Sequence, residues 1–192
     1  ISSFERFGGY TGGTMNVSGT ERAERYSGSW VTVEAFAMPG VRPLLGREFL
    51  PGEDTPTGAK VAVLGYDMWQ TRFGGDRGVL GTTIRVNGVP FEVVGVMPDG
   101  FAWPNNDQLW LPMQTDPLVG GRDEGLSLQV AGTLKPGVTR TQAETELNTI
   151  LQRLGETYPA TGKGHAAIVA PFTDFFIGPE PRQLLWTMLG AV

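Results

Sequence analysis

The 192-residue sequence contains no cysteine and a single histidine. The lack of cysteine excludes disulfide bonds and thiolate metal sites, but it does not indicate a cellular compartment. His165 alone cannot form a zinc site of several imidazoles, and no carboxylate lies near it at the spacing of a metal ligand. The chain also begins at Ile1 without an initiator methionine or a signal-like apolar run, which is typical of a segment of a longer protein.

Positive charge is scarce. There are 15 basic against 20 acidic side chains, which gives a formal net charge of −5. Lysine occurs only at Lys60, Lys135 and Lys163, and no basic stripe is present. Nucleic-acid binding and adsorption to anionic lipid both depend on clustered positive charge, so the sequence argues against both functions.

Long hydrophobic runs are missing as well. No stretch reaches the ~18 apolar residues that a membrane-spanning helix requires. Residues 184–192 are nevertheless uncharged and largely apolar, and Trp186 lies near their start, behind Arg182. Such a run suits the interfacial end of a transmembrane helix or a C-terminal helix packed on the core, and composition alone favours neither.

The chain shows no catalytic constellation. It has no Gly-x-Ser-x-Gly element, and the glycine-rich residues 73–78 lack the Gly-Lys-Ser/Thr of a phosphate-binding loop. The acidic pairs at residues 53–54 and 123–124 lie in turn sequences, where carboxylates are usually solvated. Residues 105–107 form too short a cluster for a calcium loop. We therefore predict no catalytic residue, no metal site and no cofactor, and His165 is expected at the surface.

What the sequence does contain is turn chemistry between apolar segments. It has 28 glycines and 14 prolines, and only 18% of its residues are charged. The clearest local signal is Asn87-Gly88 between two β-rich arms, since both residues tolerate the positive φ of a type I′ hairpin turn. Its second arm, residues 91–96, is nearly all apolar and is expected to lie deeper in a sheet.

Other elements follow from periodicity. Residues 141–158 have one apolar stripe, and Thr141 with Glu144 forms a pattern typical of a capping box. Residues 1–19 are expected to be mainly loop. The remaining expected elements are strands at 24–33, 60–65, 126–134 and 166–171, a helical turn at 33–38, and helices at 66–73 and 179–192. This order predicts an α+β fold of two small mixed α/β subdomains.

Aromatic side chains supply the only candidates for a binding surface. Residues 100–104 and 109–112 are aromatic, proline-rich segments expected at edges, although Trp110 itself sits among apolar residues typical of a core. Phe101 and Trp103 are the best candidates for exposure and contact with a partner. The alternative is that both side chains pack onto the other subdomain.

Several segments, in order, resemble the MacB-like periplasmic core domain of ABC transporter permeases, most of all the FtsX-like or acidobacterial-type branch. Residues 41–49 (VRPLLGREF) are similar to the family pattern GVRPxLGRxF. Residues 60–76 resemble VVLSyxlWxrrFGgD, and the hairpin continued through Phe101 resembles VlGrtirlnGxpfxVVGVmPxgF. Residues 109–112 and the segment from Leu134 match lWvPl and RLkPGvtxxqAxaeL. The resemblance covers roughly residues 30–192.

The resemblance implies a particular domain division. A porter-like βαβ subdomain would consist of residues 1–45 and 122–192, built from both chain ends, and residues 46–121 would form a smaller inserted subdomain that carries the hairpin. Residues 184–192 would then begin a transmembrane helix.

It also implies a function. The chain would be a non-catalytic domain on the periplasmic face of the bacterial cytoplasmic membrane, coupling cytoplasmic ATPase cycling to movement or partner handling outside. Its partners would be its flanking transmembrane helices, an ATPase domain or subunit, a second permease copy and a periplasmic adaptor. The sequence indicates no substrate. Two alternatives stay open: a free-standing extracytoplasmic module that binds glycan or protein through Phe101 and Trp103, and a hydrolase that uses His165.

Overall fold

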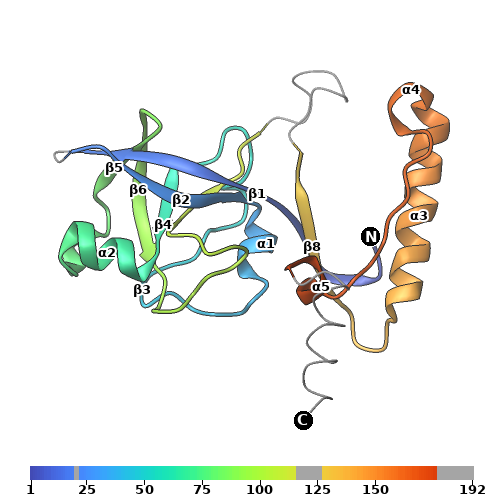
Figure 1. Ribbon diagram of the computed structural model, residues 1–192, viewed down its shortest axis with the longest axis horizontal. Coiled ribbons are helices and arrows are strands. Elements are labelled where there is room, and N and C mark those ends of the chain that lie inside the picture. Colours follow the sequence, from blue (N-terminus) through green and yellow to red (C-terminus); the bar gives the residue numbers. More distant parts are fainter. Residues whose placement is uncertain (20–21, 116–126, 177–192) are drawn as a thin grey trace, which may run out of the picture. The chain divides into compact units, whose positions relative to one another are not determined.

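The structure is a computed structural model that describes residues 1–19, 22–115 and 127–176 (Figure 1). Its contacts divide the chain into two compact units. We call Arg6–Gly132 the sheet unit, and Ile1–Glu5 together with Thr133–Val192 the terminal unit. An α+β fold is confirmed.

These boundaries differ from the expected ones at residues 45 and 121. One unit contains both chain ends, and its N-terminal share is Ile1–Glu5, whereas the expected share is residues 1–45. The reason is strand pairing, because residues 6–45 contribute strands to the same sheet as the segment expected to be inserted. The porter-like character of the part built from both ends stays a prediction.

The sheet unit contains most of the strands. Strand β1 begins in the terminal unit and β8 ends there. The elements are β1 (Phe4–Ser18), β2 (Glu24–Val31), α1 (Val33–Ala37), β3 (Leu45–Gly46), β4 (Val61–Leu64), α2 (Tyr66–Phe73), a 3₁₀ turn (Arg77–Val79), β5 (Thr83–Val86), β6 (Val89–Val96), β7 (Leu109–Pro112) and β8 (Gln129–Leu134).

The sheet is mixed, and its strand pairings form a closed ring. The strand order is β2-β7-β4-β6-β5-β1-β8, and β1 also pairs with β2 along Tyr10–Val17. β4 runs parallel to β6, and β2 runs parallel to β7. β7 therefore lies between β2 and β4 with all four residues buried, so the expectation that residues 109–112 form an edge is wrong.

Two apolar clusters occupy the two faces of this sheet. Along β7, Leu109 and Leu111 belong to one cluster and Trp110 to the other, as the two-residue period of a strand requires. Helix α2 covers the first cluster with Met68 and Trp69, while Phe36 of α1 lies in the second. The two faces explain why the central strands are apolar throughout.

The Asn87-Gly88 hairpin is confirmed. Asn87 has φ 50° and Gly88 has φ 84°, and β5 pairs with β6 from Val86↔Val89 to Thr83↔Glu92. Asn87 also binds β1 through two hydrogen bonds. Its side-chain Oδ1 accepts the Asn16 backbone N–H at 2.9 Å, and its backbone N–H donates to Asn16 O at 2.8 Å. The turn thereby extends the contact of the hairpin with β1.

The terminal unit is organised by one long helix, α3 (Arg140–Thr157), which α4 (Pro159–Gly162) follows. The capping box lies two residues before the expected one, with Thr139 as the N-cap and Gln142 as its reciprocal partner. Glu146 of α3 accepts the backbone N–H groups of Ser2 and Ser3, the latter at 2.8 Å, and so fixes the N-terminal segment.

Three further expectations have different outcomes. Residues 1–19 are not mainly loop, because most of them form β1. Residues 166–171 carry no strand, although the segment runs along α3 before α5 (Phe172–Phe176) begins. The expected helix over 179–192, with its membrane-entering part at 184–192, lies outside the described residues. No helix in the described part of the chain is long and apolar enough to cross a membrane.

Candidate functional site

The loop between β6 and β7 carries both residues that the sequence singled out. Phe101 is half-buried, and its ring lies 5.8 Å from Phe36 and 5.2 Å from Trp110 between centroids, edge to face in both pairs. These distances are typical of aromatic packing in a core. Phe101 therefore closes the second apolar cluster rather than standing free.

Trp103 is anchored on the same cluster by hydrogen bonds. Its Nε1 donates to the Ala35 carbonyl at 2.8 Å, and its own carbonyl accepts Trp110 Nε1 at 2.7 Å. Its ring lies 6.2 Å from that of Tyr10. The structure thus places Phe101 and Trp103 on one loop, where both contact residues of their own unit, among them Phe36, Ala35 and Trp110. Their contact with a partner stays a prediction.

A polar hollow of 370 Å³ lies beside this loop, where β4 and β6 end and α2 begins. Its walls include the carboxylates of Asp67, Asp99 and Asp107 and the ring of Phe101. Only Asp107 is buried, with 8% of its surface exposed. The hollow is therefore acidic and has one carboxylate at its protected side.

Asp107 is held by a partner far away in the sequence. Ser29 of β2 donates its hydroxyl to Asp107 Oδ2 at 2.7 Å. Burial raises the pKa of Asp107 above its ordinary value, against the opposing effect of the Ser29 hydrogen bond. Burial also raises the pKa of Tyr10, to which the charge of Asp107 adds. A carboxyl of this kind favours its neutral form more than a solvated one does.

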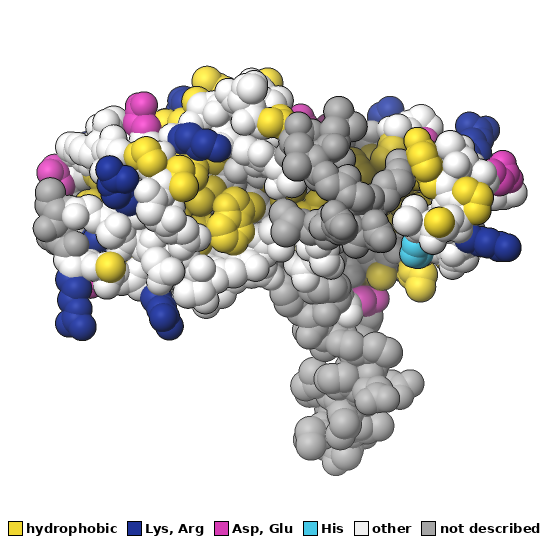
Figure 2. Space-filling model, turned by 90° about the horizontal axis from the view of Figure 1, so that it is seen from above, with side chains coloured by type: hydrophobic (Ala, Val, Ile, Leu, Met, Phe, Trp, Pro, Cys, Tyr) yellow, Lys and Arg dark blue, Asp and Glu magenta, His cyan; other side chains and the backbone are white. Residues whose placement is uncertain are grey.

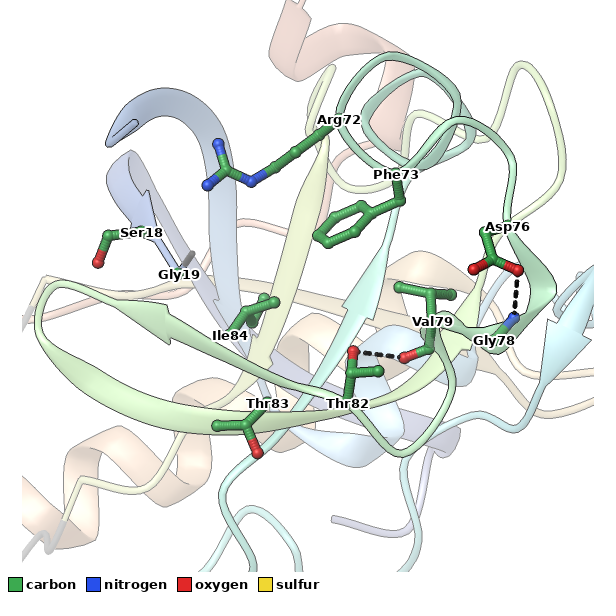
Figure 3. A pocket seen from close by; sticks show the side chains of 10 residues that line it. All are labelled: Ser18, Gly19, Arg72, Phe73, Asp76, Gly78, Val79, Thr82, Thr83 and Ile84. Atoms are coloured by element: carbon green, nitrogen blue, oxygen red, sulfur yellow. Dashed lines mark hydrogen bonds between the residues drawn. The ribbon is translucent and has the colours of Figure 1, made fainter. Parts of the chain in front are cut away.

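A second hollow, of 310 Å³, lies between α2 and β5 (Figure 3). Two of its polar side chains bond the neighbouring backbone, since Thr82 Oγ1 donates to Val79 O at 2.7 Å and Asp76 Oδ1 accepts Gly78 N–H at 2.8 Å. Arg72 points from α2 toward the end of β1 in this view.

Arg72 ties α2 to the start of β2. Its side chain is only 5% exposed, and its Nη1 donates to Glu24 Oε2 at 3.1 Å and to Arg22 O at 3.3 Å. Glu24 also accepts the Tyr26 hydroxyl, and this bond, with a smaller effect of Arg72, lowers the pKa of Glu24. The ionic groups around this hollow therefore hold two elements together.

The adjacent acids at residues 53–54 are not solvated as expected. Glu53 is 7% exposed and binds Arg47 through both oxygens, at 2.7 and 3.0 Å. It also accepts the Leu50 N–H at 2.7 Å, while Asp54 Oδ2 accepts the Val33 N–H at the start of α1 at 2.9 Å. Both carboxylates are used to fix loops.

The remaining candidate for chemistry, His165, is exposed, and Figure 2 shows the histidine at the surface. It lines a shallow hollow of 460 Å³ on α3 and α4 together with Lys163 and Glu156. Within the described residues, no group of three or more His, Asp or Glu side chains could hold a metal ion. The polar groups of this fold are arranged to position loops. Its two buried carboxyls among the described residues, Glu53 and Asp107, each bond one other side chain.

Sequence reasoning missed three of these residues. The pattern places Asp107 only in a short polar cluster, and Glu53 and Arg72 only in a turn and a helix. The partners of Asp107 and Arg72 depend on the fold, since Ser29 and Glu24 lie on β2, far from them in the sequence. Glu53 binds Arg47, which is six residues away, but its burial comes from the fold. A buried position in an alternating strand is the only local signal that Ser29 gives.

Residues 1–150 match the sequence profile of a family described as the MacB-like periplasmic core domain. No curated protein sequence matches the chain significantly.

Three solved structures share the fold. The periplasmic region of MacB from Actinobacillus actinomycetemcomitans superposes with a TM-score of 0.62 at 20% identity, over 87% of this chain and 79% of that one. The extracellular domain of the noncanonic ABC-type transporter YknZ from Gram-positive bacteria gives 0.62 at 14%, over 84% and 80%. A domain of a putative permease from Porphyromonas gingivalis gives 0.59 at 16%, over 89% and 78%.

Proposed function

The chain belongs to the family of MacB-like periplasmic core domains, and from this membership we propose that it is a non-catalytic extracytoplasmic domain that moves with the ATPase cycle of an ABC transporter permease. The profile match over residues 1–150 is the observation that carries the proposal. Two of the similar solved structures are described as parts of an ABC-type transporter and of a putative permease, and the third as the periplasmic region of MacB, which supports the proposal.

The fold suggests how movement would enter the domain. Ile1–Glu5 and Thr133–Val192 belong to the same unit, so a displacement of either chain end acts on one body. Glu146 fixes the first of these segments to α3 by accepting the N–H groups of Ser2 and Ser3. We propose that membrane helices adjoin both ends and that their movement is transmitted through this attachment.

The packing of the candidate residues supports a mechanical rather than a catalytic role. Phe101 packs against the second apolar cluster, and Trp103 is hydrogen-bonded to Ala35 and Trp110. Glu53 and Arg72 fix neighbouring segments, and His165 is exposed. A rigid sheet unit of this kind can transmit displacement without changing its own fold. Dimerisation of the permease and docking of a periplasmic adaptor belong to the same proposal.

The attachment at Glu146 gives an experiment on the full-length permease with its ATPase. Glu146→Ala removes the acceptor for both serine N–H groups, whereas Glu156→Ala removes an exposed carboxylate of the same helix and serves as the control. We expect Glu146→Ala to keep ATP hydrolysis but to reduce ATP-dependent movement of a label on α3 several-fold. Equal movement in both variants would refute this route of transmission.

A further inference from the structure

Residues 166–170 form an extended segment that runs along α3 and is held by two side chains of that helix. Ala167 N–H donates to Asn148 Oδ1 at 2.9 Å, and Ala167 O accepts Asn148 Nδ2 at 3.0 Å. Val169 N–H donates to Glu144 Oε2 at 3.0 Å. The amide of Asn148 therefore binds this backbone as a residue of a neighbouring strand would.

The opposite edge of the segment has no partner among the described residues. In an extended chain, successive residues direct their N–H and C=O groups to alternate edges. Because residues 167 and 169 face α3, Ala166, Ile168 and Ala170 direct theirs away from it. None of these three residues makes a hydrogen bond within the described part of the chain, and all three are exposed, Ile168 by 85%.

Proteins normally protect a strand edge of this kind. Charged side chains, prolines and bulges are the usual means, since a free apolar edge pairs readily with another strand. Here residues 166–170 contain only alanine, isoleucine and valine. Pro171 follows the segment and has no backbone N–H. Because residue 171 continues the series 167 and 169, which faces α3, this missing N–H does not interrupt the outer edge.

We propose that this edge pairs with the same segment of a second copy of the chain, antiparallel and centred on Ile168. In this register Ala166 lies opposite Ala170 of the second copy, and Ile168 lies opposite Ile168. The register thus contains three pairs, since Ala170 also lies opposite Ala166 of the second copy. In each pair the backbone groups of both residues point outward, so each is a hydrogen-bonded pair of an antiparallel ladder. A slip of the pairing by one residue, which places Ile168 opposite residue 167 or 169, sets inward-facing groups opposite outward-facing ones and removes the hydrogen bonds. Among the registers that keep the hydrogen bonds, only this one places Ile168 opposite itself.

Side chains and charge support the antiparallel direction with a second copy. The segment is nearly symmetric about Ile168, with alanine at both ends and small apolar residues between. Lys163 precedes it and Asp174 follows it. An antiparallel pair brings the basic end of one copy toward the acidic end of the other, whereas a parallel pair would place like charges together.

The pairing is expected to be weak between free chains. Five residues per copy bury less surface than a stable protein–protein interface requires, and a two-stranded ribbon alone is marginal. Anchoring two copies in one membrane would raise their effective concentration, and only this last step depends on the proposed function. The soluble chain should therefore dimerise reversibly in the range of about 0.1–1 mM.

Cysteine cross-linking tests the register directly, because the chain has no cysteine of its own. Under mild oxidation, Ile168→Cys should cross-link with itself, since paired residues have Cα atoms about 5.5 Å apart. Ala166→Cys and Ala170→Cys should each fail alone but cross-link when mixed, because two copies of residue 166 would lie about 14 Å apart. We expect at least ~10-fold more dimer in the two paired cases.

Sedimentation of the cysteine-free chain provides the second measurement. Ile168→Lys and Ile168→Glu should each stay monomeric where the parent chain dimerises, and an equimolar mixture should restore the dimer because opposite charges then face each other. Circular dichroism of each variant checks that the fold is retained. Equal cross-linking at all three positions, or a parent chain that stays monomeric at 1 mM, would overturn the proposal.

These assays involve no ATPase and no membrane, so their failure leaves the proposed function unaffected. Conversely, a permease without ATP-dependent movement would leave the pairing of residues 166–170 intact. If the edge instead binds an unrelated apolar strand, Ile168→Cys should give no more cross-linked dimer than Ala166→Cys, and the parent chain should sediment as a monomer at 1 mM. That outcome would also overturn pairing between copies.

Discussion

The ion pair between Arg47 and Glu53 gives the sharpest prediction about stability. The Glu53 side chain is 9% exposed and the Arg47 side chain 38% exposed, so the two partners differ in their access to water. Replacing Glu53 leaves a guanidinium that can reach solvent. Replacing Arg47 leaves a buried carboxylate with only the Leu50 N–H as a remaining partner. The second change should therefore cost more.

The expected loss of stability lies between the values for a fully buried and for an exposed ion pair, because this pair is partly buried. Breaking a fully buried pair costs about 3–5 kcal/mol, and an exposed one about 0–1 kcal/mol. For Arg47→Met we expect a loss of about 2–4 kcal/mol, because Glu53 loses its two guanidinium contacts. For Glu53→Gln we expect about 1–2 kcal/mol, since glutamine keeps the shape and one acceptor.

Urea unfolding followed by tryptophan fluorescence measures both losses. Trp30, Trp69, Trp103 and Trp110 all lie in the sheet unit, which also contains the ion pair. Arg42→Met, a change of the same type at an exposed position, is the matched control and should lie within about 0.5 kcal/mol of the parent chain. A smaller loss for Arg47→Met than for Glu53→Gln would refute the argument from unequal exposure.

The remaining predictions concern single residues. Asn87→Gly should cost about 1 kcal/mol, because glycine accepts φ 50° but loses the contact with Asn16, and Asn87→Ala should cost about 1 kcal/mol more through left-handed backbone strain, both measured by chemical unfolding. The raised pKa of Asp107 means that its stabilising effect is complete at low pH and decreases as the pH rises through the folded-state pKa. Asp107→Asn should therefore be more stable than the parent at pH 7 and equal to it near pH 3, as thermal unfolding would show; a constant difference would contradict this sign. Hydrogen bonds from Ser2 and Ser3 lower the pKa of Glu146 to about 2, so amide exchange at these serines should stay slow as the pH falls below 4.5 and accelerate only near pH 2.

Elements set by local chemistry could be predicted from the sequence. The Asn87-Gly88 turn requires two positive φ angles, and the structure has both. Helix α2 ends at Gly74 in a left-handed conformation, as the glycine pair after Phe73 indicates. In these cases the residues that determine the structure lie within a few positions of it, so the pattern is sufficient.

Strand β1 could not be predicted in this way. Its glycines are poor strand formers, yet Gly8, and Gly28 in the partner strand, are required by contacts that only the fold creates. A Cβ on Gly8 would lie 2.3 Å from Thr32 Oγ1, and one on Gly28, in the partner strand, would lie 2.6 Å from Met15 Sδ. Local propensity is therefore overruled by close packing between β1 and its neighbours.

The capping box of α3 and the candidate site show two other limits of sequence reasoning. Thr139 with Gln142 and Thr141 with Glu144 are overlapping patterns of equal quality, and only the hydrogen bonds distinguish them. Phe101 could be identified as an aromatic in a proline-rich loop, but its burial depends on Phe36 and Trp110, which come from other elements.

The central claim is that the domain moves with ATP hydrolysis in a permease. The most direct test is a distance measurement between spin labels at one exposed position of α3, such as Gln152, in two copies of the full-length permease reconstituted with its ATPase. The account predicts different distance distributions in the ATP-bound and ADP-bound states, and no difference in a variant whose ATPase site is inactive. Identical distributions in both nucleotide states, with hydrolysis intact, would contradict it.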